Sequence, residues 1–431
     1  MSEYIPENIY NQTNANKKAW QVCLIGALYF LYIFIQMTKF NAIGNMLMMD
    51  FKISSAELGV ISSAYFWGNL IFLIPAGLLL DRYSTKNILL SVMLITIVSI
   101  VIFAYAKNAS TAAWCFLATG IAGSFALLIP LRLASRWFKP EKMAFVSGVI
   151  ITVGFLGAII SQAPLTWLAH QVGWRYTMFI NAGFGALLFI LMAYIIEDFP
   201  IGANMELSKE NSVGVHSLFA GLKIVVANKQ NWVFGIYTCL LNLSIFIFGA
   251  VFGARFLIKV HHISSIQSST IITIMFLGAM LGSPVFGYIS DKIGFRKLPM
   301  FFGALISFGL LTVVIYKINM NLLELYGIFF GIGFFTSTQV LSYPVITESN
   351  KHAHAATALS LASTLIMSGG AIFLPLFGWL LDLSWDHTTI NGTPVYSTTD
   401  YQSALWLLLV TCCLSIMVLF FGKETRCKNI S

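Results

Sequence analysis

Three basic residues lie at or near the ends of long apolar runs, where a buried charge is costly and usually serves a function. They are Lys39, Arg132 and Arg255. No His lies near the centre of a run, and the acidic residues closest to the runs lie near run ends, at Asp81, Asp291, Glu348 and Asp382. Arginine can hold a carboxylate through two parallel hydrogen bonds. The pattern therefore favours a site for a carboxylate-bearing solute over one that exchanges a cation against protons.

Each of these basic residues also has a structural alternative. Lys39 and Arg255 could extend to the lipid headgroups, and Arg132 could belong with Arg136 to a basic loop. Neutral polar residues on the apolar runs could complete a binding site, or could bond helix to helix at about 0.6 kcal/mol per bond. These residues are Tyr29, Tyr32, Gln36, Asn69, Gln162, Asn181, Asn242, Gln339 and Tyr343.

The elements that position these residues must be membrane helices, because the chain has too few charges to solvate its surface. Hydrophobic residues make up 58% of the 431 residues, charged residues make up 10%, and the mean hydropathy is +0.82. Soluble domains carry about 25% charged residues. Apolar runs of about 20 residues can cross a bilayer, and their backbone groups must bond within the segment. We therefore predict an all-α membrane protein with twelve transmembrane helices, at about residues 20–40, 56–80, 87–106, 111–135, 143–166, 176–196, 232–254, 267–289, 298–316, 321–345, 354–381 and 402–421.

A long polar stretch divides the runs into two sets of six. We predict a cytoplasmic tail at 1–19, an N-terminal six-helix bundle at 20–196, a cytoplasmic linker at 197–231, a C-terminal six-helix bundle at 232–421 and a second tail at 422–431. The first nineteen residues are polar, and the apolar run that follows is long enough to stay in the membrane, so no signal peptide is expected.

The net charge of +8 is explained by membrane topology rather than by nucleic-acid binding. If both termini are cytoplasmic, most Lys and Arg residues lie on the cytoplasmic side, in agreement with the positive-inside rule. The six cysteines show no metal-ligand spacing. We therefore expect a multi-pass protein with cytoplasmic termini and no bound metal, and its short loops favour a bacterial inner membrane.

Two charged loops repeat at a fixed distance. Gly77, Asp81 and Lys86 follow the second apolar run, and Gly287, Asp291 and Arg296 follow the eighth, each 210 positions later. A carboxylate at a helix exit can accept hydrogen bonds from a neighbouring helix N-terminus. The duplication predicts a latch between two halves, although a plain charged loop that sets topology is the alternative. The residues expected to act in gating are Gly77, Asp81, Arg82, Lys86, Arg136, Gly287, Asp291, Lys292, Arg296 and Glu348.

At these loops the chain resembles the major facilitator superfamily, whose signature is Gly-x-x-x-Asp-Arg/Lys-x-Gly-x-Arg/Lys. The second copy fits with Gly294 in place, whereas the first has Ser84 where glycine is usual. The resemblance implies two six-helix bundles that rock around a midplane cavity lined by helices 1, 4, 7 and 10. The stretch 130–141 is similar to organic-anion and sugar-phosphate members, and Tyr343–Glu348 is similar to bacterial phagosomal-nutrient (amino-acid) transporters.

We therefore expect a secondary active transporter, not an enzyme, that moves a small carboxylate-bearing nutrient, an amino acid or an organic acid, by alternating access. A siderophore or metabolite exporter or importer of the same fold is the alternative. The chain contains no GxxxxGK[ST] motif for ATP binding, so no cofactor is expected, and coupling to protons or sodium would supply the energy of a symporter. The expected partners are the small-molecule substrate and the lipid bilayer, with no nucleic acid, and the protein is expected to be a monomer.

Overall fold

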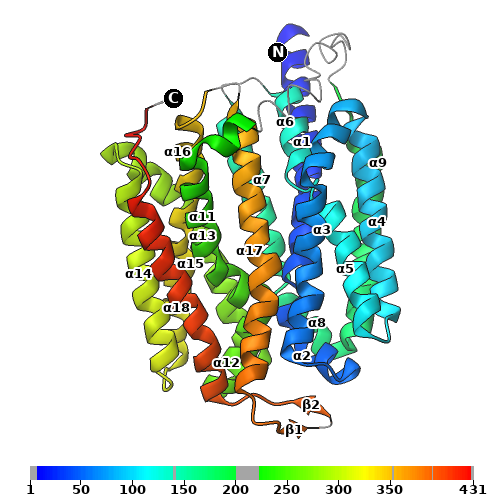
Figure 1. Ribbon diagram of the computed structural model, residues 1–431. Coiled ribbons are helices and arrows are strands. Elements are labelled where there is room, and N and C mark those ends of the chain that lie inside the picture. The colour runs from blue at the N-terminus through cyan, green and yellow to red at the C-terminus, as the bar shows by residue number, and fades with distance from the viewer. Residues whose placement is uncertain (1–6, 139–141, 200–222, 352–353, 391, 429–431) are drawn as a thin grey trace, which may run out of the picture.

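The computed structural model describes residues 7–138, 142–199, 223–351, 354–390 and 392–428, apart from the side chains of 7–16, 81, 144 and 356. In this part of the chain, twelve helical segments are long and apolar enough to cross a membrane. They confirm the predicted all-α membrane fold of two six-helix bundles (Figure 1). Most of the predicted linker, residues 200–222, lies outside the described residues.

Several crossing segments consist of two or three helices joined end to end. The first half contains α1 (Glu7–Thr38), α2 (Phe40–Phe51), α3 (Ser55–Arg82), α4 (Thr85–Tyr105), α5 (Ala109–Gly123), α6 (Leu128–Trp137), α7 (Met143–Ile160), α8 (Ala163–Val172) and α9 (Trp174–Ile195). The second half contains α11 (Lys229–Ser244), the π-helix η3 (Ile245–Phe252), α12 (Gly253–His261), α13 (Ser265–Ile293), α14 (Lys297–Tyr316), α15 (Leu322–Thr336), the 3-10 helix η4 (Ser337–Leu341), α16 (Ser342–Glu348), α17 (Ala355–Ser384) and α18 (Thr398–Phe420).

The two ends of the bundle are distinct. Both described chain ends lie at one of them, which we call the terminus end (Figure 1). The opposite end, the hairpin end, carries the antiparallel strands β1 (Thr389–Ile390) and β2 (Thr393–Pro394). Capping boxes, in which side chains bond to the first free backbone N–H groups, start α3, α13, α15 and α18.

The halves pack on each other through two sets of helices. α3 packs along α17, while α7 and α8 pack on α13. A Cβ atom on Gly378 of α17 would clash with the Ser55 carbonyl at the start of α3. Small residues of this kind let two helix backbones approach closely in a membrane, so glycine is required at this contact near the hairpin end.

Some helix limits differ from the predicted ones. α1 begins at Glu7, within the predicted tail, and its path continues through α2 to Phe51, whereas the first run was predicted to end at residue 40. The seventh run was predicted to end at residue 254, yet α12 continues to His261. Charged residues lower the local hydropathy at both places while backbone hydrogen bonding continues. Lys39 and Arg255, predicted at helix ends, therefore lie within these two paths.

Candidate functional site

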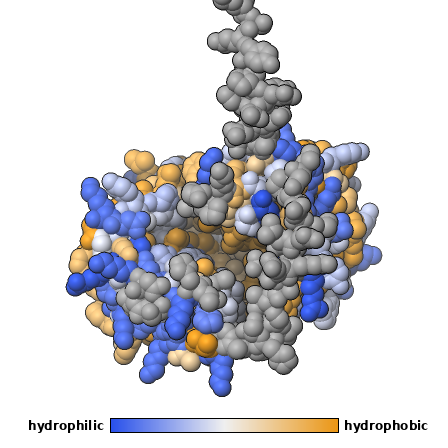
Figure 2. Space-filling model, turned by 90° about the horizontal axis from the view of Figure 1, so that it is seen from above, coloured by the Kyte–Doolittle hydropathy of each residue, from blue (hydrophilic) through white to orange (hydrophobic). Residues whose placement is uncertain are grey.

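The two halves are joined at the hairpin end. Nine hydrogen bonds between residues of different halves lie there. One example is the pair of hydroxyl groups of Thr166 and Ser269, whose oxygen atoms lie 2.7 Å apart. At the terminus end the molecule is instead hollowed at its centre, and much of the visible wall of the hollow is apolar (Figure 2). The molecule is therefore closed at one end and open at the other.

Five crossing segments depart from α-helical geometry, one of them the fifth segment, which has a turn at 161–162 between α7 and α8. The first breaks at Lys39, between α1 and α2, and the fourth has turns at 124–127, between α5 and α6. The seventh contains the π-helix η3, and the tenth contains the 3-10 helix η4. Such interruptions are common at functional sites, and broken helices often form the binding sites of transporters. Four of the five interruptions fall on helices 1, 4, 7 and 10, the set for which the resemblance implies a cavity-lining position, and the other lies in helix 5.

Side-chain amides from the first half bind the carbonyl groups of η3. Asn41 Nδ2 donates to the carbonyl oxygens of Phe248 at 2.7 Å and Gly249 at 2.6 Å, and Asn41 Oδ1 accepts from the Ala254 N–H at 3.1 Å. Gln162 Nε2 donates to the Gly249 carbonyl at 3.2 Å. These bonds link the halves at the irregular part of the seventh segment. Asn41 was not among the predicted residues, although a buried amide two positions after Lys39 was a usable signal.

Lys39 belongs to a polar cluster inside the first half. Its Nζ donates to Gln36 Oε1 at 3.0 Å and lies 4.8 Å and 4.6 Å from the ring centroids of Phe103 and Phe116. Asn181 Nδ2 also donates to Gln36 Oε1, at 3.1 Å. The predicted residues Lys39, Gln36 and Tyr32 are thus brought together, since the Tyr32 hydroxyl donates to the Asn181 carbonyl at 3.1 Å. Lys39 is only 1% exposed, so its side chain is buried in this conformation.

The second half brings together two other predicted residues. Gln339 Nε2 in η4 donates to Asn242 Oδ1 in α11 at 2.8 Å. Gln339 Oε1 is buried without a hydrogen-bond partner among the described residues. Tyr343 lies one helical turn after Gln339 and is half-buried. This amide pair beside η4 offers hydrogen-bonding groups that a polar solute could use.

Arg255 lies at the closed end of the interface. Its Nη2 donates to Ser55 Oγ at 3.0 Å, its other terminal nitrogen contacts Met48 Sδ, and its guanidinium carbon lies 5.0 Å from the Phe252 ring centroid. Ser55 and Met48 belong to the first half, so Arg255 joins the halves. Its side chain is buried rather than extended to the surface.

Arg132 lies apart from both polar clusters. It occupies α6, between the turns at 124–127 and the terminus end, and is half-buried. Of the three basic residues predicted for substrate binding, the structure therefore places Lys39 in one bundle, Arg255 between the bundles and Arg132 toward the terminus end. They do not form a single cluster.

The first charged loop connects α3 to α4. Arg136 Nη1 donates to Thr85 Oγ1 at 2.9 Å, and the Lys86 N–H donates to Asp198 Oδ1 at 2.8 Å. Ser84, which replaces the usual glycine, caps α4 by accepting from the Asn87 N–H at 3.2 Å. Arg82 is exposed. Asp81 is the residue before the last in α3, and its side chain lies outside the described part, as does any contact it makes.

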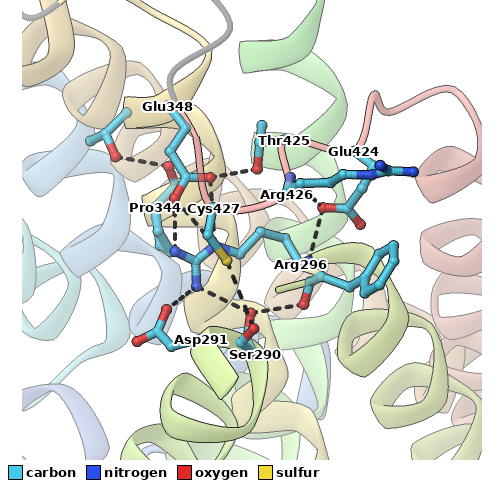
Figure 3. Close-up of polar contacts among 11 residues, drawn as sticks. Ser290, Asp291, Arg296, Pro344, Glu348, Glu424, Thr425, Arg426 and Cys427 are labelled. Carbon is cyan, nitrogen blue, oxygen red and sulfur yellow. Dashed lines mark hydrogen bonds and ion pairs between the residues drawn. The ribbon is translucent and has the colours of Figure 1, made fainter. Parts of the chain in front are cut away.

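The second charged loop forms an ionic network with the C-terminal segment, in which Arg296 is buried and Asp291 is exposed (Figure 3). Arg296 Nη1 donates to Asp291 Oδ1 at 2.6 Å, and Arg296 Nη2 donates to Glu348 Oε1 at 2.7 Å. Glu424 Oε1 accepts from the Arg296 N–H at 2.9 Å, and the Thr425 hydroxyl donates to Glu348. Burial alone would lower the pKa of Arg296, but hydrogen bonds from its guanidinium to Glu348 and Asp291 raise it.

The remaining loop residues make fewer contacts. Lys292 Nζ lies 5.8 Å from the Tyr288 ring centroid. Cβ atoms added to Gly77 and Gly287 would meet no described atom within 4 Å. Both glycines thus face open space in this conformation. Among the described residues, no group of His, Cys, Asp and Glu side chains could hold a metal ion.

Comparison with protein families identifies the fold. A family model described as Major Facilitator Superfamily matches residues 25–258 and, in a second match, residues 234–429. The solved structure of a bacterial homologue of the human lysosomal transporter Spinster, in an inward-facing and unoccupied conformation, superposes with a TM-score of 0.73. That match has 15% sequence identity and covers 94% of this chain and 95% of the other.

Three curated relatives differ in what they are named for. The probable nitrate/nitrite antiporter NarK1 of Thermus thermophilus is 22% identical, over 64% of this chain and 62% of that protein. The gentisate transporter of Corynebacterium glutamicum is 24% identical, over 89% and 86%. The choline/ethanolamine transporter flvcr2a of Danio rerio is 22% identical, over 86% and 82%. Two of these names give an anion or an organic acid, and the third gives amines.

Proposed function

The chain belongs to the Major Facilitator Superfamily, and from this premise we propose that it carries a small carboxylate-bearing solute, an amino acid or an organic acid, across a bacterial inner membrane. Transport would proceed by alternating access of two bundles, coupled to protons or sodium. We place the terminus end in the cytoplasm, so that the described conformation is open inward. The domain limits predicted from the sequence and a monomeric state belong to the same proposal.

The observation that carries the proposal is the buried amino group of Lys39. It forms no ion pair with a carboxylate among the described residues. A charge on this group without a counter-ion would be costly, and an anionic solute that approached it would lower this cost and favour the protonated form. Lys39 also occupies the break between α1 and α2, so a change in its partners can be transmitted to helix orientation. The named acid and nitrate relatives support the same solute class.

The other clusters suggest how the cycle would run. In the proposed cycle, a solute that enters the hollow from the terminus end would reach the Asn242–Gln339 amide pair, whose Gln339 Oε1 has no hydrogen-bond partner among the described residues. The bonds that Asn41, Gln162 and Arg255 make across the hairpin end must break before the solute can leave there. When the hairpin end opens, the terminus end must close, so that the solute has access to only one side of the membrane at a time. Broken helices near the midplane supply both the binding groups and the hinge positions in such a cycle.

Ligand-induced stabilisation and uptake into liposomes test the proposal. A solute at 100 times its dissociation constant should stabilise the purified protein by about 2.7 kcal/mol. We expect this stabilisation from one class of carboxylates, and at least a tenfold loss of apparent affinity in Lys39→Gln, since a hydrogen bond to a charged group is worth about 1.5–3 kcal/mol. Lys39→Arg should retain most of the affinity, and Lys107→Gln, at an exposed lysine, is the matched control. Equal affinity in Lys39→Gln and the control would sink the assignment.

Two other solute classes are tested in the same stabilisation assay. Choline and ethanolamine are tested because of the relative that is named for them. Ferric siderophores test the alternative of a siderophore or metabolite carrier on the same fold. Stabilisation by an amine alone, with no response to any acid, would refute the carboxylate proposal and leave the fold assignment intact.

A further inference from the structure

The first backbone groups of α3 are satisfied by residues of the opposite half. The Ala56 N–H donates to Asp382 Oδ2 at 3.1 Å, and the Ser55 N–H donates to the Tyr396 hydroxyl oxygen at 2.9 Å. The Tyr396 hydroxyl in turn donates to Asp382 Oδ1. The N-cap residue Ser54, in the same half as α3, caps a different N–H group, because its Oγ accepts from the Glu57 N–H. Two of the N–H groups that every helix start leaves free therefore depend on contact between the halves.

These contacts are shielded from water. Ser55 is fully buried and Tyr396 is 4% exposed, while Asp382 is half-buried. Burial and the adjacent Asp382 carboxylate raise the pKa of Tyr396, so its hydroxyl stays a donor. A buried N–H group that loses its acceptor is costly, and the positive end of the helix dipole favours a carboxylate there. The capping groups therefore favour the state in which the hairpin end is closed.

The antiparallel helices α3 and α17 each have an aspartate in the last turn. The start of α3 and the last turn of α17 meet at the hairpin end, where Gly378 lets their backbones approach. Asp382 lies in that last turn of α17. Asp81 lies in the last turn of α3, at the opposite end of the molecule. Each helix thus carries an aspartate in its final turn, toward the end of the molecule where the other helix begins.

We propose that Asp382, together with Tyr396, is the latch that holds the hairpin end closed, by capping the N-terminus of α3 from the other half. Neither residue was predicted as a site residue. The latch acts on the equilibrium between the two conformations and does not touch the solute. It therefore stands whether the transported solute is an acid or an amine.

The test measures how accessible the hairpin end is at a position away from the latch. Ser269 is buried against Thr166 where α13 meets α8, so local fraying of α3 would not expose it. In a variant with Ser269→Cys as its only cysteine, a membrane-impermeant maleimide added on the hairpin side reports opening. Asp382→Asn should raise the labelling rate about tenfold, since the bonds lost involve a charged acceptor. Asp382→Glu should restore slow labelling.

Asp386→Asn is the matched control, because Asp386 is exposed in the loop that follows α17 and bonds only to Thr388 among the described residues. The control should label as slowly as the parent. Equal labelling in Asp382→Asn and Asp386→Asn would overturn the proposal, and so would faster labelling from the terminus side only. If Asp382→Asn fails to fold, the same labelling is measured in Tyr396→Phe. This variant keeps the Asp382 carboxylate but removes the acceptor of the Ser55 N–H. Labelling of Tyr396→Phe at the parent rate would then refute the latch.

Discussion

Arg296 illustrates at the residue scale how one buried cation organises the terminus end of the second half. Its guanidinium bonds to Asp291 and Glu348, while its backbone N–H is held by Glu424 from the C-terminal segment (Figure 3). The sequence motif predicted Asp291, Arg296 and Glu348 as gating residues, and the structure brings the three together. Their role in gating stays a prediction. The part played by Glu424 could not be predicted, because nothing in its neighbourhood marks it as a partner of a loop far away in the chain.

Glu348→Gln should destabilise the protein by about 3 kcal/mol, because it leaves the buried Arg296 charge without its main partner. Thermal unfolding in detergent measures the loss. The pKa of Arg296 is raised above its already high ordinary value, so the stability contributed by its charged form is fully present at neutral and moderately basic pH and is lost only in strong base. The effect should therefore be the same at about pH 6 and at about pH 9.

The matched control for this change is Glu324→Gln. Glu324 forms an exposed ion pair with Lys317 at 2.8 Å, and exposed pairs contribute little because water and salt screen them. Similar melting temperatures for the Glu348 and Glu324 variants would show that the Arg296 network does not stabilise the fold.

At the scale of the element, η3 is the clearest departure from a regular helix. Its bonds reach from residue i to residue i+5, and the carbonyl groups of Phe248 and Gly249 accept bonds from Asn41 and Gln162 instead. The irregular geometry is therefore tied to the partner half. A hydropathy pattern cannot show this, because an apolar π-helix and an apolar α-helix have the same composition.

Asn41→Ala should weaken the closed hairpin end. It removes three hydrogen bonds, and each buried group left without a partner costs about 1–3 kcal/mol. A melting temperature clearly below that of Asn108→Ala is expected, since Asn108 is an exposed helix cap worth about 1 kcal/mol. Hydrogen exchange across Ile245–Phe252 should rise in the Asn41 variant alone. Unchanged exchange in η3 would argue against its dependence on the partner half.

At the scale of the whole molecule, the closed hairpin end and the hollow terminus end define one state of a cycle. Gly59 of α3 lies close to the carbonyl of Leu374 in α17, whereas Gly77, on the same face eighteen residues and five turns later, meets no described atom within 4 Å. The helices α3 and α17 therefore pack tightly at one end and not at the other. Closure of the terminus end would bring Gly77 toward α17.

Gly77→Leu should fold normally but transport at least about tenfold more slowly, since an added side chain in a packed interface costs about 1–3 kcal/mol. The cost arises only in the state with a closed terminus end. Liposome uptake and thermal unfolding measured together separate this effect from misfolding. Gly309→Leu is the control, because Gly309 in α14 is exposed and also has free space. Wild-type uptake by the Gly77 variant would contradict the proposed closure.

The proposed orientation is tested with fusions of alkaline phosphatase, which is active only outside the cytoplasm. A fusion after Phe421 should be inactive, whereas a fusion within 385–397 should be active, because these segments lie at opposite ends of the molecule (Figure 1). The physical basis is the bias of Lys and Arg toward the terminus end. The reverse pattern of activity would place the terminus end outside.

The sequence by itself determined the membrane class, the count of twelve crossing helices, the two halves and the repeated loop. These features follow from hydropathy, charge bias and short motifs, which depend on residues close together in the chain. Only the tertiary structure decided which polar residues meet: Lys39 with Gln36, Asn41 with η3, Asp382 with the start of α3, and Glu424 with Arg296. Such pairings depend on how helices from distant parts of the chain are rotated and packed, and local composition does not encode that rotation. For the same reason, the sequence marked Lys39, Arg132 and Arg255 as candidates for substrate binding, which stays a prediction, but their separation into three different places was not predictable.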